Sequence, residues 1–256
     1  MSRGPAIIAH RGASHDAPEN TLASVRLGWA QGADAVEVDI QQTGDGHLVV
    51  IHDDTTRRTT GRKGKVSDLT LAELRTLEAG AWKHARWAGE PIPTLAEVLD
   101  MVPSGRRLFV EIKCGMESVP EFVSTVRRSG RKAGEVVPIG FDLETMRRVK
   151  EALPRHEVCW VQGFRRTWRG GWSPTAERLI ERARGAGLDG LDLGVRGPVN
   201  AEFVGKVHAA GLRLYLWTVD APGRARALAA AGVDGLTTNR PGWLRERLGV
   251  ARQQPA

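Results

Sequence analysis

One local pattern occurs three times in the second half of the chain and restricts the fold more than any other feature. An alanine-glycine pair at the end of a helical stretch leads directly into a short apolar segment, and the copies begin at Ala186, Ala210 and Ala231. Glycine is the usual residue where a helix ends in the left-handed conformation, and short apolar segments are typical of buried parallel strands. The pattern therefore predicts successive helix-to-strand joints, as in a sheet built from βα units.

The same alternation extends along the rest of the chain. Amphipathic helical stretches separate short runs rich in Val, Ile and Leu, and right-handed crossovers through such helices pair the strands in parallel. The predicted strands are residues 6–9, 35–40, 48–51, 108–112, 136–139, 157–161, 190–193, 212–218 and 235–238. With 256 residues, close to the roughly 250 typical of one (β/α)₈ barrel, the chain is predicted to form an α/β TIM barrel.

One stretch, residues 53–93, interrupts the rhythm because it contains no strand pattern. A loop of this length inside a compact domain is usually functional or an insertion. The composition does not change enough along the chain to indicate a separate large domain. We therefore expect residues 1–256 to form a single barrel domain with a small insertion after the early strands.

The composition excludes several classes of protein. With 41% hydrophobic and 26% charged residues the chain has enough apolar material for a core. Its apolar runs fall well short of the roughly 18 residues that cross a bilayer, and the N-terminal one is too short for a signal peptide, so no membrane anchor is expected. Two cysteines, Cys114 and Cys159, exclude a disulfide scaffold and favour a cytoplasmic setting.

The net charge of +7 comes largely from arginine. A basic chain can bind nucleic acid through phosphate neutralisation. However, the sequence contains no block of five like charges, so most of these residues are expected to lie on solvated helix faces and no nucleic-acid partner is expected. The cluster of Phe164, Trp168 and Trp172 with three arginines leaves two interpretations open, a loop that receives part of a substrate or a nucleic-acid face.

Carboxylates are concentrated at the carboxyl ends of predicted strands, where barrel enzymes place their chemistry. Glu37 and Asp39 are two residues apart on one strand and therefore share a face, and the same holds for Glu111 and Lys113 on another. Three carboxylates in the mouth of a barrel are unfavourable unless a cation lies among them, and oxygen-only ligands favour Mg²⁺ or Ca²⁺. The alternative is that they pair only with Arg11 and Lys113.

Two histidines and two cations complete the set at the strand ends. His10 and His52 follow neighbouring predicted strands and are candidates for an acid–base pair, because imidazole titrates near neutrality. Arg11 and Lys113 are natural ligands for a phosphate. Cations, histidines and a metal together suit phosphoryl transfer to water or to an internal hydroxyl.

These residues resemble the signature of the glycerophosphodiester phosphodiesterase family. The resemblance extends from about residue 6 to about residue 248, with its motifs in the family's order. The motifs are His10-Arg11-Gly12, Pro18-Glu19-Asn20-Thr21, Glu37-Val38-Asp39, His52-Asp53, Glu111-Ile112-Lys113, Trp217-Thr218-Val219-Asp220 and Gly232-Val233-Asp234-Gly235 through Pro241.

The resemblance implies a TIM barrel that hydrolyses glycerophosphodiesters to glycerol 3-phosphate and an alcohol. In the mechanism that the family implies, the glycerol 2-hydroxyl of the substrate attacks phosphorus, and water opens the resulting cyclic phosphate. Carried over by position, the roles are acid–base catalysis by His10 and His52, binding of a divalent cation by Glu37, Asp39 and Glu111, phosphate binding by Arg11 and Lys113, and packing against the glycerol carbons by Trp217.

Some features leave room for other functions. A lysophospholipid could be cleaved by the same site, and a non-catalytic barrel could bind phosphorylated ligands with it. The core-packing alternative for Trp217 also stays open. Asn239 stands where relatives often have Asp, and from its position after the last predicted strand it is expected to be a loop or helix-cap residue.

Overall fold

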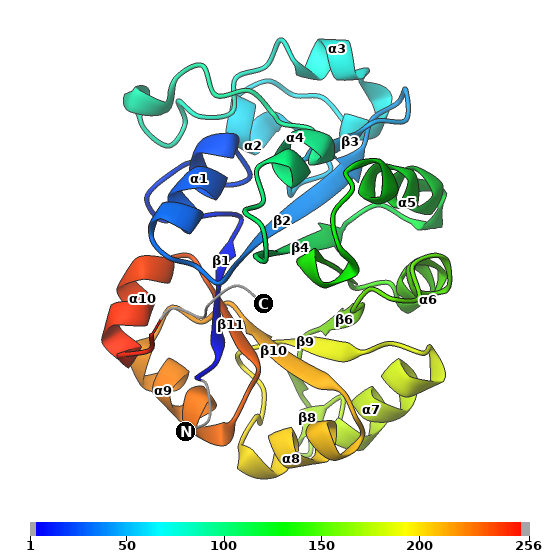
Figure 1. Cartoon of the computed structure of the whole chain (residues 1–256), viewed down its shortest axis with the longest axis vertical. Helices are drawn as coiled ribbons and strands as arrows, with labels where there is room; N and C mark the ends of the chain where they lie inside the picture. Colours follow the sequence, from blue (N-terminus) through cyan, green and yellow to red (C-terminus); the bar gives the residue numbers. More distant parts are fainter. Residues whose placement is uncertain (1–3, 252–256) are drawn as a thin grey trace.

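The computed structural model describes residues 4–251, and eight of its strands close into a ring (Figure 1). Every neighbouring pair in this ring is parallel, and β1 pairs with β2 to complete it. The barrel strands are β1 (Ala6–His10), β2 (Ala35–Gln42), β4 (Arg107–Ile112), β5 (Val136–Gly140), β6 (Cys159–Gln162), β9 (Gly190–Gly194), β10 (Arg213–Trp217) and β11 (Gly235–Thr238). The predicted TIM barrel is confirmed.

Helices surround the ring and cover its outer face (Figure 1). The α-helices around the barrel are α1 (Leu22–Ala30), α4 (Leu95–Asp100), α5 (Val119–Arg128), α6 (Leu143–Ala152), α7 (Ala176–Gly185), α8 (Ala201–Ala209), α9 (Pro222–Ala231) and α10 (Pro241–Leu248). Short 3₁₀ turns η3 (Met116–Ser118) and η4 (Ala133–Glu135) precede α5 and β5. Gly187 and Gly211, just past α7 and α8, have φ values of +70° and +78°, as the sequence pattern predicts.

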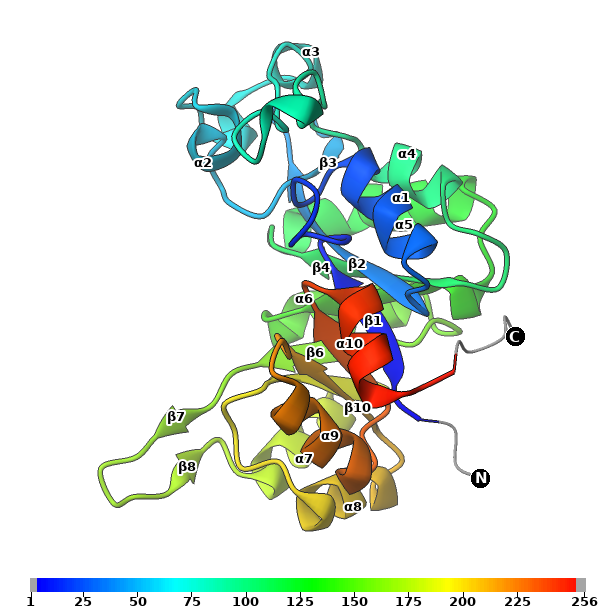
Figure 2. The ribbon, with the colours of Figure 1, turned by 90° about the vertical axis from the view of Figure 1, so that its left-hand side faces the viewer.

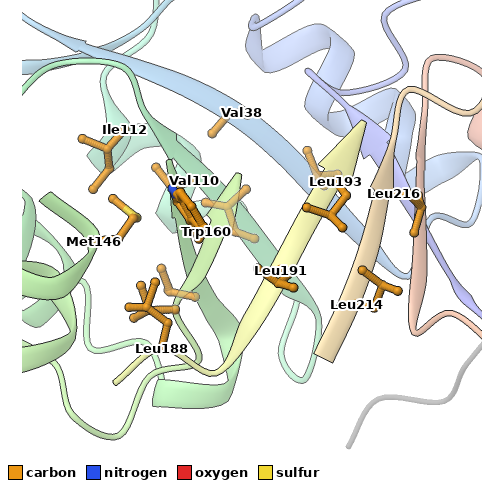
Figure 3. Close-up of a cluster of buried hydrophobic side chains, with 14 of the residues drawn as sticks. Val38, Val110, Ile112, Met146, Trp160, Leu188, Leu191, Leu193, Leu214 and Leu216 are labelled. Atoms are coloured by element: carbon orange, nitrogen blue, oxygen red, sulfur yellow. The ribbon is translucent and has the colours of Figure 1, made fainter. Parts of the chain in front are cut away.

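The apolar core has two parts because successive strand residues point to opposite faces. Outward-facing residues such as Val110 and Leu191 pack with helix residues such as Met146 in the large cluster shown in Figure 3. Inward-facing residues fill the barrel itself, where the rings of Phe109 and Tyr215 meet edge to face at 5.0 Å. Among the described residues these side chains fill the barrel interior below its mouth.

The prediction that residues 48–51 form a further parallel strand of the sheet is wrong. Strand β3 (Leu48–Val50) runs antiparallel to the end of β2, outside the closed ring. The reason is the short turn between them, in which the Thr43 N–H donates to the His47 carbonyl at 2.9 Å. Five residues can close a hairpin, whereas a parallel crossover needs about a dozen. His52 therefore approaches the barrel mouth from a hairpin and not from a barrel strand.

The segment between β2 and α4 forms the predicted insertion and protrudes from the barrel (Figures 1 and 2). It begins after β2 ends at Gln42, about ten residues earlier than expected, and includes β3. It has its own small apolar cluster around Val49, Leu74 and Ile92. Its helical turns are α2 (Arg57–Thr60), η1 (Val66–Asp68), α3 (Leu71–Leu74) and η2 (Ala85–Trp87). These turns are short and add no barrel strand, in agreement with the absence of a strand pattern in residues 53–93.

A second projection lies between β6 and α7. Strands β7 (Arg165–Arg166) and β8 (Trp172–Ser173) pair as a short antiparallel hairpin that extends away from the barrel (Figure 2). In that view the hairpin and α2 lie on the side opposite the chain ends. Within residues 4–251, none of the helices is long and apolar enough to cross a membrane.

Candidate active site

A cavity of about 180 Å³ lies at the carboxyl ends of the barrel strands. The strand register explains why distant residues meet there, because His10 is level with Glu37 across β1 and β2, and Asp39 is level with Glu111 across β2 and β4. All the predicted site residues except Asp39 line the cavity. The predicted residues that line it are His10, Arg11, Glu37, His52, Glu111, Lys113 and Trp217.

The three predicted carboxylates form one compact group. Glu37, Asp39 and Glu111 each offer an oxygen within 4.8 Å of the others, and Asp39 is fully buried beneath the cavity wall. Glu37 Oε1 and Asp39 Oδ1 are buried and receive no hydrogen bond from any residue between 4 and 251. Orphaned buried oxygens of this kind fit a hard divalent cation as their common partner.

The carboxylates also repel one another, which their pKa values reflect. Burial, together with the charges of Asp39 and Glu111, raises the pKa of Glu37 well above its ordinary range. Burial and the charge of Asp39 raise the pKa of Glu111 to about 7. A bound cation would relieve both effects, since it replaces repulsion between the carboxylates with attraction.

Arg11 holds two of these carboxylates in place. Its backbone is left-handed, with φ of +55°, and its N–H donates to Glu37 Oε2 at 2.9 Å. Its guanidinium lies 3.0 Å from Asp39 Oδ2 through Nε and donates to Glu19 Oε1 at 2.8 Å. Asn20 donates from its amide to Asp39 Oδ2 at 2.9 Å and accepts from the Asp39 N–H at 3.2 Å.

Each histidine has its Nδ1 atom fixed by an oxygen. His10 Nδ1 lies 2.7 Å from Asn239 Oδ1, which can only accept, so the Nδ1 atom carries the proton and Nε2 is free to accept one. His52 Nδ1 lies 2.7 Å from Asp53 Oδ1, and Lys113 Nζ lies 3.1 Å from His52 Nε2. Burial, and next the charge of Arg11, lowers the pKa of His10, so this imidazole is neutral at pH 7.

Arg58 of the insertion bridges Glu19, which contacts Arg11, and Asp53, which contacts His52. It donates to both oxygens of Glu19 at 2.8 Å and to both oxygens of Asp53 at 2.7 and 3.0 Å. Although burial opposes ionisation, the bonds from Arg58 and Arg11 lower the pKa of Glu19 to about 2. Hydrogen bonds from Arg58 also lower the pKa of Asp53 to about 2. Glu19 and Asp53 therefore stay ionised beside Arg11 and His52.

Sequence reasoning gave no role to several residues that the fold brings to the site. Asn239 lies in the loop after β11, as expected, but it also orients His10 through the contact with Nδ1, a role that the sequence did not indicate. Asp220 fixes Asn239 in turn, accepting from its side-chain amide at 2.6 Å. Asp192 on β9 lines the cavity, 2% exposed, and its Oδ1 has no hydrogen-bond partner in the part of the chain that the structure describes.

The opposite wall of the cavity is aromatic. Trp217 packs edge to face against Phe141 with ring centroids 5.7 Å apart, and its indole N–H donates to the Asp192 carbonyl at 3.2 Å. Both rings line the cavity, so Trp217 has a face toward the site as well as a packing role. The cavity thus has one charged wall and one apolar wall, an arrangement suited to a phosphate joined to a short carbon chain.

A parallel barrel with carboxylates, imidazoles and cations at its carboxyl mouth is the architecture of a barrel hydrolase. The sequence model of the glycerophosphoryl diester phosphodiesterase family matches residues 10–243, and the chain belongs to this family. It is thus a phosphodiesterase.

Individual relatives agree along almost the whole chain. The glycerophosphodiester phosphodiesterase of Caldanaerobacter subterraneus is 33% identical over 92% of this chain and 94% of its own. That of Bacillus subtilis is 32% identical over 91% of this chain and 83% of its own. A phosphodiesterase structure from Oleispira antarctica, in complex with the product sn-glycerol-3-phosphate, superimposes with a TM-score of 0.85 at 28% identity and covers 96% of this chain and 97% of its own.

Proposed function

We propose that this protein hydrolyses glycerophosphodiesters to glycerol 3-phosphate and an alcohol by means of two histidines and a carboxylate-bound divalent cation. The observation that carries the proposal is the meeting of three carboxylates and two imidazoles around one cavity. The family and the product named for the Oleispira relative support the choice of substrate. The two free cysteines support a cytoplasmic location, and we treat residues 1–256 as one functional domain.

Glu37, Asp39 and Glu111 would hold the cation, Mg²⁺ or Ca²⁺ by the chemistry of the donors. Such an ion, when bound, polarises phosphoryl oxygens and lowers the pKa of a nearby hydroxyl. The side chains of Arg11 and Lys113 would bind the phosphate in addition to the cation. Lys113 Nζ lies 3.0 Å from Glu111 Oε1 and 3.7 Å from Asp39 Oδ1, so its charge is next to the carboxylate group.

The proton transfers follow from the state of each histidine. His10 is neutral with Nε2 free, so it accepts the proton of the glycerol 2-hydroxyl as that oxygen bonds to phosphorus. His52, held at Nδ1 by ionised Asp53, gives a proton to the leaving alcohol as its bond to phosphorus breaks. Water then opens the cyclic phosphate with the roles of the two histidines reversed.

The test is a substrate series given to the purified protein. Glycerophosphocholine, glycerophosphoethanolamine and glycerophosphoglycerol are offered with Mg²⁺ or Ca²⁺, and release of glycerol 3-phosphate is measured. A lysophospholipid, scored by release of its head group, tests the second substrate class. We expect turnover of the water-soluble diesters, and their failure to react under all these conditions refutes the proposed function.

A matched analogue tests the role of the substrate hydroxyl. We expect a diester with 2-deoxyglycerol in place of glycerol to bind but to react at least about a thousand-fold more slowly, since loss of an intramolecular nucleophile removes a large part of the rate. The comparison is made by kcat at saturating substrate. Equal rates for the two diesters would show that water attacks phosphorus directly.

Asn239→Asp tests the assignment of His10 as the base. The added carboxylate stabilises the imidazolium form and raises the pKa of His10. A base acts in its neutral form, so kcat/KM should fall at acidic pH as His10 becomes protonated. In the wild type the midpoint of this fall should lie below the ordinary histidine pKa of about 6.5, and in the variant it should move to higher pH. An unchanged limb measured between pH 4.5 and 8 would remove His10 from this role.

A further inference from the structure

The β7–β8 hairpin is a short projection that is held by backbone pairing and by aromatic contacts at its base. Arg165 pairs with Ser173 and Arg166 with Trp172, and the Thr167 N–H donates across the tip to the Gly171 carbonyl at 2.9 Å. At its base, Phe164 packs edge to face against Trp172, at 6.4 Å between centroids, and against Phe203 of α8 at 6.0 Å. These contacts anchor the base, so the residues at the tip are not needed to hold the hairpin on the barrel.

The tip combines one exposed aromatic ring with unpaired positive charge. Trp168 is 88% exposed, twice the value for Trp82 or Phe141. The side chains of Arg165, Arg166 and Arg169 are exposed, and within residues 4–251 none of them forms a salt bridge. No acidic residue occurs between residues 158 and 176 in the sequence, so the hairpin itself carries only positive charge.

A basic cavity lies at the base of the same hairpin. Its volume is about 350 Å³, and Arg165, Arg178 and Arg182 line it without any carboxylate. Arg182 also stacks on Trp160, with its guanidinium carbon 4.8 Å from the ring centroid, which holds it in place. The cavity therefore has the size and charge for a small anionic group.

We propose that the β7–β8 hairpin docks the protein on an anionic phospholipid surface, with Trp168 at head-group level, the hairpin arginines over lipid phosphates and the basic cavity holding one head group. Tryptophan and arginine are the residues that favour this interface. Nucleic acid fits the hairpin less well, because the Arg169 guanidinium lies 4.6 Å from the Trp168 ring centroid and competes with a base for one face of the ring.

Docking in this way turns the barrel mouth toward the lipid. The hairpin directly follows β6, whose carboxyl end borders the active-site cavity through Val161. On the same side of the molecule lies α2 of the insertion (Figure 2). This helix begins with exposed Arg57, and exposed Arg62, Lys63 and Lys65 follow it in the sequence. The inference goes beyond the proposed hydrolysis and does not depend on it, since it concerns where the protein works.

The experiment is co-sedimentation of the whole protein with vesicles. Vesicles of phosphatidylcholine alone are compared with vesicles that contain 30% phosphatidylglycerol, at low and at physiological salt. We expect binding only to the anionic vesicles. Each arginine near such a surface contributes about five-fold, so the triple variant Arg165→Glu, Arg166→Glu and Arg169→Glu should bind at least about a hundred-fold more weakly. Trp168→Ala should also weaken binding, by a factor that salt changes little.

The control variant carries the same change of net charge elsewhere. Arg26→Glu in α1, Arg184→Glu in α7 and Arg155→Glu in the loop between α6 and β6 replace exposed arginines. This triple variant should bind vesicles nearly as well as wild type. All three variants should keep the wild-type rate on a water-soluble diester, which shows that they are folded and separates this inference from the proposed function.

Three results would overturn the inference. The first is equal binding to neutral and anionic vesicles, or no binding to either. The second is equal loss of binding in the hairpin variant and in the control variant, which would indicate a general effect of charge. The third is tight binding to single-stranded DNA that the hairpin substitutions abolish, while anionic vesicles are not bound, which would assign the hairpin to nucleic acid.

Discussion

Removing divalent cations with a chelator is expected to abolish turnover, and adding Mg²⁺ or Ca²⁺ is expected to restore it. Without a cation, Glu37 Oε1 and Asp39 Oδ1 are buried with no hydrogen-bond partner among the described residues, and the carboxylates repel one another. Glu37→Gln should have the same effect as chelation and should not be rescued by millimolar metal. Glu202→Gln, at an exposed carboxylate on α8, is the matched control and should be fully active.

Metal binding should also depend on pH in a defined direction. Burial and Asp39 raise the pKa of Glu111 to about 7, so the cation-free protein takes up a proton that the cation must displace. A carboxylate with a raised pKa costs stability as pH increases from about 4.3, its unfolded value, toward about 7. The increase in Tm caused by saturating cation should therefore be larger at pH 8 than at pH 5.5.

Two outcomes would contradict this account of the carboxylates. One is full activity after thorough metal removal, verified by elemental analysis of the protein. The other is a gain in Tm from cation that is the same for wild type and for Glu37→Gln, because that gain would come from a site elsewhere.

Replacing either active-site histidine by alanine is expected to lower kcat by two to four orders of magnitude, the usual contribution of a positioned acid or base. His10 and His52 stand on different elements and hold different partners, so each loss should be large by itself. KM should change much less, because neither imidazole carries the charge that binds the phosphate. The assay is release of glycerol 3-phosphate at saturating substrate.

The control for this pair is His47→Ala, at a histidine with 54% of its side chain exposed in the turn between β2 and β3. It should retain the wild-type rate. Circular dichroism and Tm confirm that each variant is folded, since both site histidines lie at the barrel mouth and not in its core. Near-wild-type activity in both alanine variants would refute the acid–base assignment.

The barrel and most of its mouth could be predicted from the sequence because both depend on short-range patterns. Strand spacing places Glu37 and Asp39 on one face, and parallel pairing places Glu111 beside them, so the pattern and the register agree. The prediction for residues 48–51 was wrong because an apolar run looks the same in a parallel strand and in a hairpin. The gap of only seven residues between the predicted strands 35–40 and 48–51 was the signal that could have distinguished them, because a parallel crossover needs about a dozen.

The residues that surround and orient the predicted site side chains could not be predicted in the same way. Arg58 meets Glu19 from 39 positions away, and Asn239 meets His10 from 229 positions away. Neither contact has a local pattern, because each arises only when the barrel closes and the insertion folds back over it. Asp192 looks like any strand residue until the register turns it into the cavity.

The central claim is that this cavity cleaves the bond between phosphorus and the alcohol and leaves phosphate on the glycerol. Following glycerophosphocholine by ³¹P nuclear magnetic resonance with the purified protein and Mg²⁺ or Ca²⁺ tests it directly. We predict that glycerol 3-phosphate is the only final phosphorus product, formed through a transient cyclic phosphate. Formation of phosphocholine and glycerol, or an unchanged substrate signal with either cation, would contradict the claim.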